Sequence, residues 1–445
     1  MKYRNRILAL GFCCASTLVA ASDDLLATDD FAFDTSEIEV SKPHWTDGFK
    51  TTLEHSHTQI PAEPSREQSS VRLEYESNIA DGWYAKLDTR YRYFWDKDDL
   101  AEARGDAYGR NKLQRAWLQY SRGACTATAG RQTLIWGTVE GTFVTDIVTP
   151  FDYTEQLLTE YGNVRLAQDM LVGECFVANA QIQAFYTPEA ETDIFQHHPL
   201  SFTIAPTVPA IHLDQDAKEE WGLRYKWQGG RYDISLMYAQ LYDNTATPVI
   251  NNNSGSTLND DDANYLPEII ASLMNTGSLP PGLSVEAELA KFDLVGVAST
   301  IAVGRLLLKA EAAFRDNQLL RFSTERTERY DAALGFEYTT SDNHIFNGGV
   351  WATHLKNDKL KQRDIQVITM GWRHSYLNDN LVMSVLGNWA SNPRFATATI
   401  LAEYQWSDYW SSAFALSLAD LDESSKDLPV ASAEKAATLS IKYEF

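Results

Sequence analysis

Polar and aromatic residues with irregular spacing stand out between Gly130 and Tyr161. The run Thr149-Pro150-Phe151-Asp152-Tyr153 and the glycines around Trp136 depart from the alternation of the neighbouring segments. Such a segment could restrict passage through an enclosed space, because irregular backbone at membrane depth is tolerated only where it lines a cavity. We therefore expect residues 137–162 to form a constricting loop. Its expected members are Trp136, Glu140, Asp146, Asp152, Tyr153 and Glu155.

Trp136, Pro150 and Asp152 also have a simpler interpretation, in which each only shapes the loop. Asp152, for example, could make a local turn hydrogen bond after Pro150. For the single residues this interpretation is favoured, whereas for the segment as a whole the constriction is favoured.

Charged residues recur at every second position along several segments of the chain. From Trp83 to Trp95, one set of alternate residues is mostly apolar, whereas the other includes Lys86, Asp88 and Arg90. Inward charges of both signs would orient polar solutes, whereas pairing across neighbouring strands would only stiffen the wall. The cations expected to line the pore are Lys86, Arg90, Arg92, Arg115, Arg131, Arg165 and Arg224.

Catalysis and metal binding find little support in the sequence. A hydrolase needs a nucleophile held by a histidine and an orienting group, and the nine histidines lie in no such motif. The acidic stretch Asp260–Asp262 lacks the ordered ligand spacing of a calcium loop. We therefore expect no enzyme activity, no metal site and no cofactor.

The elements that must position these residues are strands. Alternation over about ten residues, with short turns at one end and long polar loops at the other, is typical of a membrane-spanning barrel. It predicts an all-β, antiparallel transmembrane β-barrel of about 18 strands, with 16 as the alternative. The tight turns, placed at sites such as Asp81-Gly82, Gly123 and Gly173, all follow even-numbered strands, so both ends of the barrel would face the periplasm. Residues 243–288 are expected to form a long extracellular loop with a short helix.

The two ends of the sequence predict export. Lys2, Arg4 and Arg6 precede an apolar run from Ile7 to Ala21, which indicates a signal peptide over residues 1–21. Residues 22–43 would then form an acidic periplasmic segment, and residues 44–445 the barrel. At the other end Tyr443 and Phe445 alternate with polar residues, which resembles the C-terminal assembly signal of outer-membrane barrels.

Two cysteines, Cys125 and Cys175, remain outside the expected signal peptide. A disulfide is possible in an oxidising compartment. The turn expected at Gly173 puts one strand between the two cysteines, which argues against a bridge. The sequence therefore leaves the disulfide open.

The motifs Gly130-Arg131-Gln132 and Trp136-Gly137, with a downstream Asp146, resemble those of outer-membrane channels of the alginate-export type and related uncharacterised barrels. The resemblance covers roughly thirty-five residues closely, together with overall length and strand number. It implies a barrel in the outer membrane of a Gram-negative bacterium, and an export conduit for a polysaccharide or lipid-like product as one possible function.

The function expected from the residues is diffusion of small or linear polar solutes, including oligosaccharides, through a porin-like channel. The alternatives are the export conduit, with periplasmic partners, and a non-conducting surface scaffold or adhesin. Expected partners are outer-membrane lipid, lipopolysaccharide and the barrel-assembly machinery. A net charge of −23 argues against nucleic acid. Monomer and trimer remain open.

Overall fold

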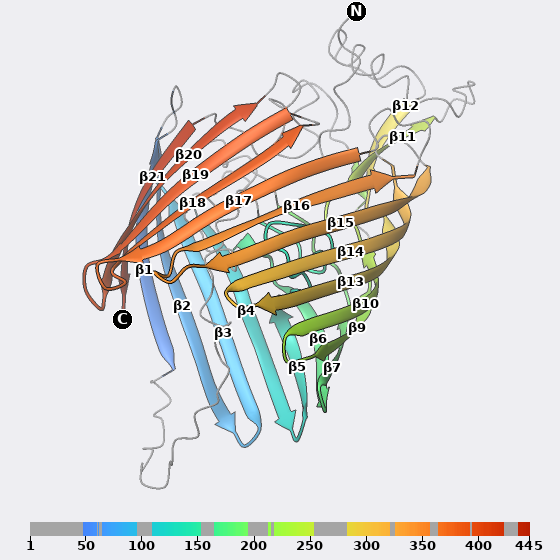
Figure 1. Ribbon diagram of the computed structural model, residues 1–445, viewed down its shortest axis with the longest axis horizontal. Coiled ribbons are helices and arrows are strands. Elements are labelled where there is room, and N and C mark those ends of the chain that lie inside the picture. Colours follow the sequence, from blue (N-terminus) through green and yellow to red (C-terminus); the bar gives the residue numbers. More distant parts are fainter. Residues whose placement is uncertain are drawn as a thin grey trace, which may run out of the picture.

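Alternation of apolar and polar residues gives each strand one face for lipid and one for the interior. The computed structural model describes residues 48–59, 61, 65–95, 109–152, 164–194, 212–214, 218–252, 283–320, 325–356, 364–391, 394–421 and 435–445. Eighteen strands form one antiparallel sheet, which confirms the predicted fold class and the strand count (Figure 1). No helix in these ranges is long and apolar enough to cross a membrane.

The strands of the barrel wall follow the order of the sequence around the ring. They are β1 (Phe49–Gln59), β2 (Arg66–Ala80), β3 (Trp83–Phe94), β4 (Gly109–Arg122), β5 (Cys125–Gln132), β6 (Gln168–Val177), β7 (Ala180–Thr187), β9 (Glu220–Gln228), β10 (Tyr232–Tyr242), β13 (Lys291–Val303), β14 (Leu306–Leu319), β15 (Arg326–Thr339), β16 (Ile345–Leu355), β17 (Asp364–Tyr376), β18 (Leu381–Ser391), β19 (Arg394–Gln405), β20 (Trp410–Leu421) and β21 (Lys435–Glu444).

Pairing of the first strand with the last closes the barrel. β1 pairs with β2 on one side and with β21 on the other, and Thr51 N donates to Phe445 O at 2.8 Å. The Tyr443 ring lies 4.8 Å from the Trp410 ring and 5.3 Å from that of Phe445. The expected role of Tyr443 and Phe445 in assembly stays a prediction.

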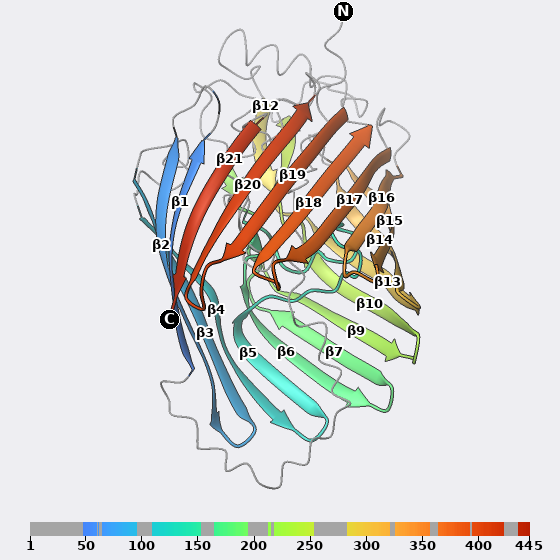
Figure 2. The ribbon, with the colours of Figure 1, turned by 60° about the vertical axis from the view of Figure 1, so that its left-hand side comes forward.

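The outer face of the wall is apolar and exposed, as a lipid-facing surface must be. Leu334 is 63% exposed and Met370 58%, whereas the inward-facing Ala239 is 0% exposed. On β3, the exposed Leu87 and Tyr91 alternate with the buried Arg90 and the neighbouring inward residues. Tilted strands with short turns at one end are visible in Figure 2.

A second, small sheet lies outside the barrel wall. It consists of β8 (His212–Asp214), β11 (Thr247–Asn252) and β12 (Leu283–Glu288). β12 pairs antiparallel with β11 and parallel with β8, so this sheet joins two of the long connections. The helix expected in the 243–288 loop, the signal peptide and the 22–43 segment lie outside the described residues.

The turn expected at Gly173 was wrong. Gly173 lies within β6, opposite Ala127 of β5 and Ala184 of β7, and the turn between β6 and β7 falls at residues 178 and 179. Ala178 adopts a positive φ of 52°, a conformation that is uncommon for a residue with a side chain. The prediction placed the turn at Gly173 because glycine is common in turns, so it ended the strand before its true end at Val177.

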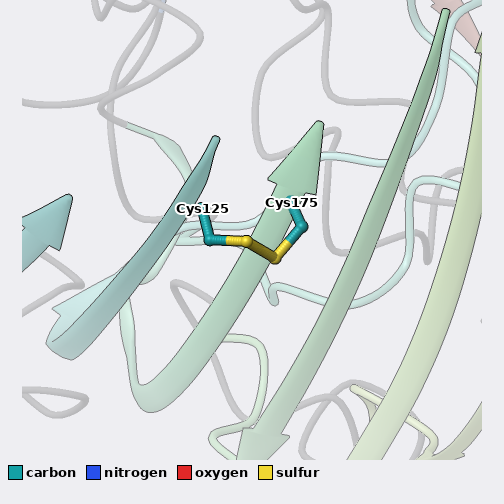
Figure 3. Close-up of a disulfide and its surroundings, with 2 residues drawn as sticks. All are labelled: Cys125 and Cys175. Atoms are coloured by element: carbon teal, nitrogen blue, oxygen red, sulfur yellow. A yellow bond between two sulfur atoms is a disulfide. The ribbon is translucent and has the colours of Figure 1, made fainter. Parts of the chain in front are cut away.

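The correct turn places Cys175 on β6, directly opposite Cys125 on β5. The two form a disulfide with a Cα–Cα distance of 4.1 Å, so the expected intervening strand is absent (Figure 3). The bridge fastens the hairpin that carries the 137–162 loop, at the end away from the loop.

Replacing Cys125 and Cys175 with serine should lower thermal stability. The bridge closes a sequence separation of 50 residues, for which the loop-closure model gives about 4 kcal/mol. Thermal unfolding of the purified barrel checks this, and reduction of the unaltered protein should reproduce the effect. Equal unfolding temperatures with and without the bridge would show that the strand ladders alone fix the hairpin.

Candidate functional site: a loop folded across the lumen

The last part of β5 begins at Gly130, and the chain leaves the wall after Gln132. Gly130 has φ +121°, and a Cβ there would collide with the Ala116 carbonyl oxygen, so a side chain would be strained in both conformation and space. Two residues later, the side-chain amide Nε2 of Gln132 donates to Met170 O at 3.2 Å and to Thr128 O at 3.3 Å. These contacts end the strand and direct the chain inward (Figure 1).

Arg131, expected to line the pore, lies on the outer face instead. Its strand partner Asp169 has a side chain that is 69% exposed, between the inward-facing Gln168 and Met170. Arg131 Nη1 lies 2.9 Å from Glu191 Oε1, and its Nε donates to Leu113 O at 3.2 Å. Arg131 lies near the end of β5, and there it links β4 to the segment that follows β7.

Trp136 anchors the first part of the loop against β7 and β9. The side chain is 1% exposed, donates to Gln183 Oε1 at 2.9 Å and packs edge-on against Phe185 at 5.3 Å. Its Cη2 lies 2.7 Å from where a Cβ on Gly222 would be. Because Gly222 has no side chain, the indole can press directly against the wall.

The tip of the loop reaches the opposite side of the barrel. Val139 Cγ1 lies 2.8 Å from where a Cβ on Gly335 of β15 would be. Glu140 and Gly141 line a small pocket with residues of β16, β17 and β18, which lie opposite β5 in the ring. The loop therefore crosses the lumen.

Apolar packing fixes one side of the loop. Val144 and Val148 are 0% and 1% exposed and belong to the same buried cluster as Trp136 and Val139. The wall residues of that cluster lie on strands from β6 around to β19, and they include Met170, Phe185, Met237, Leu241, Phe292, Leu294, Ala313, Trp351, Val367 and Phe395. This side is packed like a protein core rather than like a water-filled passage.

A single carboxylate on β14 holds the tip. Glu311 accepts hydrogen bonds from the backbone N–H groups of Thr138, Val139 (2.6 Å) and Thr145 (3.1 Å). It also accepts one from Thr145 Oγ1 at 2.7 Å. On the same strand Lys309 forms an ion pair with Glu140.

Further contacts hold the descending and returning parts of the loop. Arg315 donates to Phe143 O at 2.7 Å, and Arg165 forms an ion pair with Asp146. The Arg165 guanidinium lies 4.6 Å from the centre of the Phe151 ring, and Phe151 pairs with Arg165 through an isolated bridge. Arg165 therefore belongs to the loop itself and not to a strand of the wall.

Asp152 brings the loop to the wall on the other side of β5. Its carboxylate is 0% exposed and lies 3.1 Å from Lys112 Nζ, 3.7 Å from Arg110 and 3.9 Å from Arg92. These cations stand on β3 and β4. The loop thus has an anchor on either side of the strand from which it starts.

The other expected pore-lining cations lie on the inner wall with acidic or carbonyl partners. Lys86 bonds Glu76 at 2.8 Å, and Arg90 bonds Glu54 at 2.9 Å. Arg115 stands opposite Asp88 in the ladder, and Arg224 donates to Ile135 O at 3.3 Å. Tyr153 and Glu155 lie outside the described residues. Whether any of these residues selects a solute stays a prediction.

Asp193, which the sequence did not single out, holds the segment before Asp152. It accepts a hydrogen bond from Phe151 N at 2.7 Å and another from Thr245 Oγ1 at 2.7 Å. Burial raises the pKa of Asp193 to about 6, aided by Asp243, while the two hydrogen bonds and Arg165 act in the opposite direction.

No group of three or more potential ligands in the described residues could hold a metal ion.

The raised pKa of Asp193 predicts a pH dependence of loop anchoring. Because the folded state favours the protonated acid, the stabilisation is full below the ordinary pKa of 3.8 and is lost as the pH rises through about 6. We expect the unfolding temperature of the unaltered protein to fall between about pH 4 and about pH 7 relative to Asp193→Asn. Asp169→Asn, on the outer face, is the control. Parallel curves for all three proteins would contradict the assignment.

An 18-stranded antiparallel barrel with an apolar outer face and a loop folded across its lumen is the fold of an outer-membrane porin. The model of the family described as "Protein of unknown function (DUF1302)" matches residues 74–412, so the chain belongs to that family. No curated protein matches the sequence.

Solved structures of outer-membrane channels share this fold. Pseudomonas aeruginosa OccD3 (OpdP) aligns with a TM-score of 0.52 and 8% identity over 89% of this chain and 91% of its own. P. aeruginosa OpdK, solved with vanillate, gives 0.54 and 8% over 89% and 98%. Acinetobacter baumannii OccAB4 gives 0.53 and 10% over 89% and 97%. Neither the family match nor these structures support the resemblance to alginate-export channels.

Proposed function

We propose that this protein is a channel of the Gram-negative outer membrane through which small polar solutes diffuse. The observation that carries the proposal is the loop that crosses the lumen, because its anchors fix a narrow region inside a membrane-spanning barrel. The signal peptide over residues 1–21 and the constricting role of residues 137–162 form part of the proposal. The shared fold of the Occ-type channels supports it.

The chemistry of the two sides of the loop suggests where a solute passes. Towards β6–β19 the loop packs against a cluster of buried apolar side chains, which offer a polar solute no hydrogen bonds. Towards β1–β4 the inner wall carries ionic side chains, including Arg72, Arg90 and Lys112. A polar solute would keep more of its hydrogen bonds beside these groups, so we place the passage on this side.

Swelling of proteoliposomes in isotonic sugar solutions tests this function. We expect a pentose to enter faster than a disaccharide, and a disaccharide faster than a trisaccharide, because a narrow lumen slows larger solutes. Entry no faster than into protein-free liposomes would contradict the proposal and favour the non-conducting scaffold.

A further inference from the structure

Two aromatic side chains stand next to each other on the inner wall, on the side where we place the passage. Trp117 of β4 is the ladder partner of the inward-facing Lys86, and Tyr84 lies two residues before Lys86 on β3. Ladder partners, and every second residue of a strand, point to the same face. The two ring centres are 5.7 Å apart and the ring planes are inclined by 35°. The rings therefore form one apolar surface that faces the lumen.

This pair of rings is more accessible than the aromatic residues beside the loop. Phe185 and Trp351 are 3% and 1% exposed and belong to the apolar cluster against which the loop packs. Tyr84 and Trp117, in contrast, are only partly buried. The ladder partner of Trp117 on β5 is Gly130, which has no side chain to lie over the indole. A solute in the lumen can therefore reach the rings.

Polar side chains that donate and accept hydrogen bonds flank the two rings. Glu76 of β2 is the other ladder partner of Lys86, and Lys86 Nζ donates to Glu76 Oε2 at 2.8 Å. The side chain of Glu76 is 53% exposed and that of Lys86 is 21% exposed. Gln119 is the ladder partner of Tyr84, so its amide also faces the lumen. The acid and the amine together carry no net charge, so they offer hydrogen bonds without favouring an ion of either sign.

An apolar surface with hydrogen-bonding groups at its edge suits a sugar ring. One face of such a ring presents C–H groups, whose partial positive charge matches the negative face of an aromatic side chain. The hydroxyl groups at the edge of the sugar donate and accept, as the carboxylate, ammonium and amide groups of the wall require. A planar aromatic solute would stack on the same rings but would leave these polar groups without a partner in the solute.

We propose that Tyr84 and Trp117 form a subsite for the ring of an uncharged sugar. Glu76, Lys86 and Gln119 bind the hydroxyl groups of that sugar. The subsite lies between the loop and the short turns, because Tyr84 stands at the start of β3, just after the turn that joins it to β2. The inference rests on the proposed channel function and adds a substrate class and a position to it.

Block of the ion current by maltose tests the subsite. In planar bilayers with equal potassium chloride on both sides, we expect maltose to reduce the current of the unaltered protein in a saturable manner. Trp117→Leu and Tyr84→Leu keep an apolar side chain but remove the aromatic face. We expect each to raise the half-blocking concentration of maltose by about threefold to tenfold, the range that one aromatic contact supplies.

Trp83→Leu is the matched control. Trp83 precedes Tyr84 on β3 but lies on the outer face, where it is 37% exposed, so its loss should leave the block unchanged. Trp117→Phe retains an aromatic face and should retain most of the block, which makes it the test if Trp117→Leu folds poorly. Gln119→Met removes the amide at similar length and should raise the half-blocking concentration by about threefold.

Two results with a conducting protein would overturn the proposal. One is equal block by maltose in the unaltered protein and in the double variant Tyr84→Leu with Trp117→Leu, and the absence of any block counts the same way. The other is block by benzamide, a neutral planar ring without hydroxyl groups, but not by maltose. That result would identify a site for aromatic solutes instead.

Failure of the channel function has a separate signature. If the unaltered protein does not conduct, calorimetric titration with maltose tests the subsite alone, on the barrel dissolved in a detergent that contains no sugar. Heat of binding in the unaltered protein that is lost in the double variant would support the subsite. Equal heats, or no heat from either protein, would overturn it.

Discussion

Replacing Glu311 with alanine is expected to raise single-channel conductance by about twofold or more, because the tip of the loop loses its anchor in the lumen. The carboxylate accepts backbone N–H bonds from Thr138, Val139 and Thr145. Leaving a buried donor without an acceptor costs about 1–3 kcal/mol, and here three backbone donors bind the two oxygens of one carboxylate. Planar-bilayer recordings measure the effect.

Two further variants separate this role from a general effect of charge. Glu311→Gln keeps a hydrogen-bond acceptor and should fall between alanine and the unaltered protein. Glu337→Gln removes an acid from the neighbouring strand β15, where it lies 3.7 Å from Lys309. Equal conductance of Glu311→Ala and Glu337→Gln would mean that Glu311 does not hold the loop.

Introducing leucine at Gly222 is expected to displace Trp136 and to destabilise the loop. The new Cβ alone would stand 2.7 Å from Trp136 Cη2 and 2.6 Å from Phe185 Cε1, before the rest of the side chain is placed. Overpacking of a well-packed core costs about 1–3 kcal/mol, and two rigid rings give little room for relief. We expect a lower unfolding temperature and a higher, noisier conductance.

Gly173→Ala is the matched control for this substitution. Gly173 also lies in a barrel strand, but a Cβ there would meet nothing within 4 Å. It should therefore leave both the unfolding temperature and the conductance unchanged. An unchanged unfolding temperature and conductance of Gly222→Leu would mean that Trp136 does not pack against β9.

The fold could be predicted because a spanning strand has a period of two that is visible in the sequence. The alternation from Trp83 to Trp95 reappears as exposed and buried faces of β3. Turn positions are set by weaker signals. Ala178 turns the chain with a positive φ although a glycine stands five residues earlier, so the sequence placed the disulfide partners on strands that are not neighbours.

The site was less accessible to sequence reasoning because its contacts join distant segments. Unbroken alternation from Ala127 and Ala129 puts Arg131 on the outer face, whereas the prediction assumed that a charged side chain must face the lumen. There Arg131 joins Glu191 and Asp169. Glu311 follows an ordinary strand pattern, and nothing near it in sequence indicates that residues 138–145 bind it. Gly222 and Gly335 gave no signal either, since their function is to leave space for a partner far along the chain.

The role of the loop is tested most directly by the single-channel conductance of a barrel in which a short glycine-serine linker replaces residues 137–148. The disulfide between Cys125 and Cys175 holds the hairpin together in both proteins. We expect the unaltered protein to conduct and the variant with the shortened loop to conduct several-fold more. Equal conductance of the two proteins would contradict the claim that this loop narrows the lumen, and no conductance from either would contradict the channel itself.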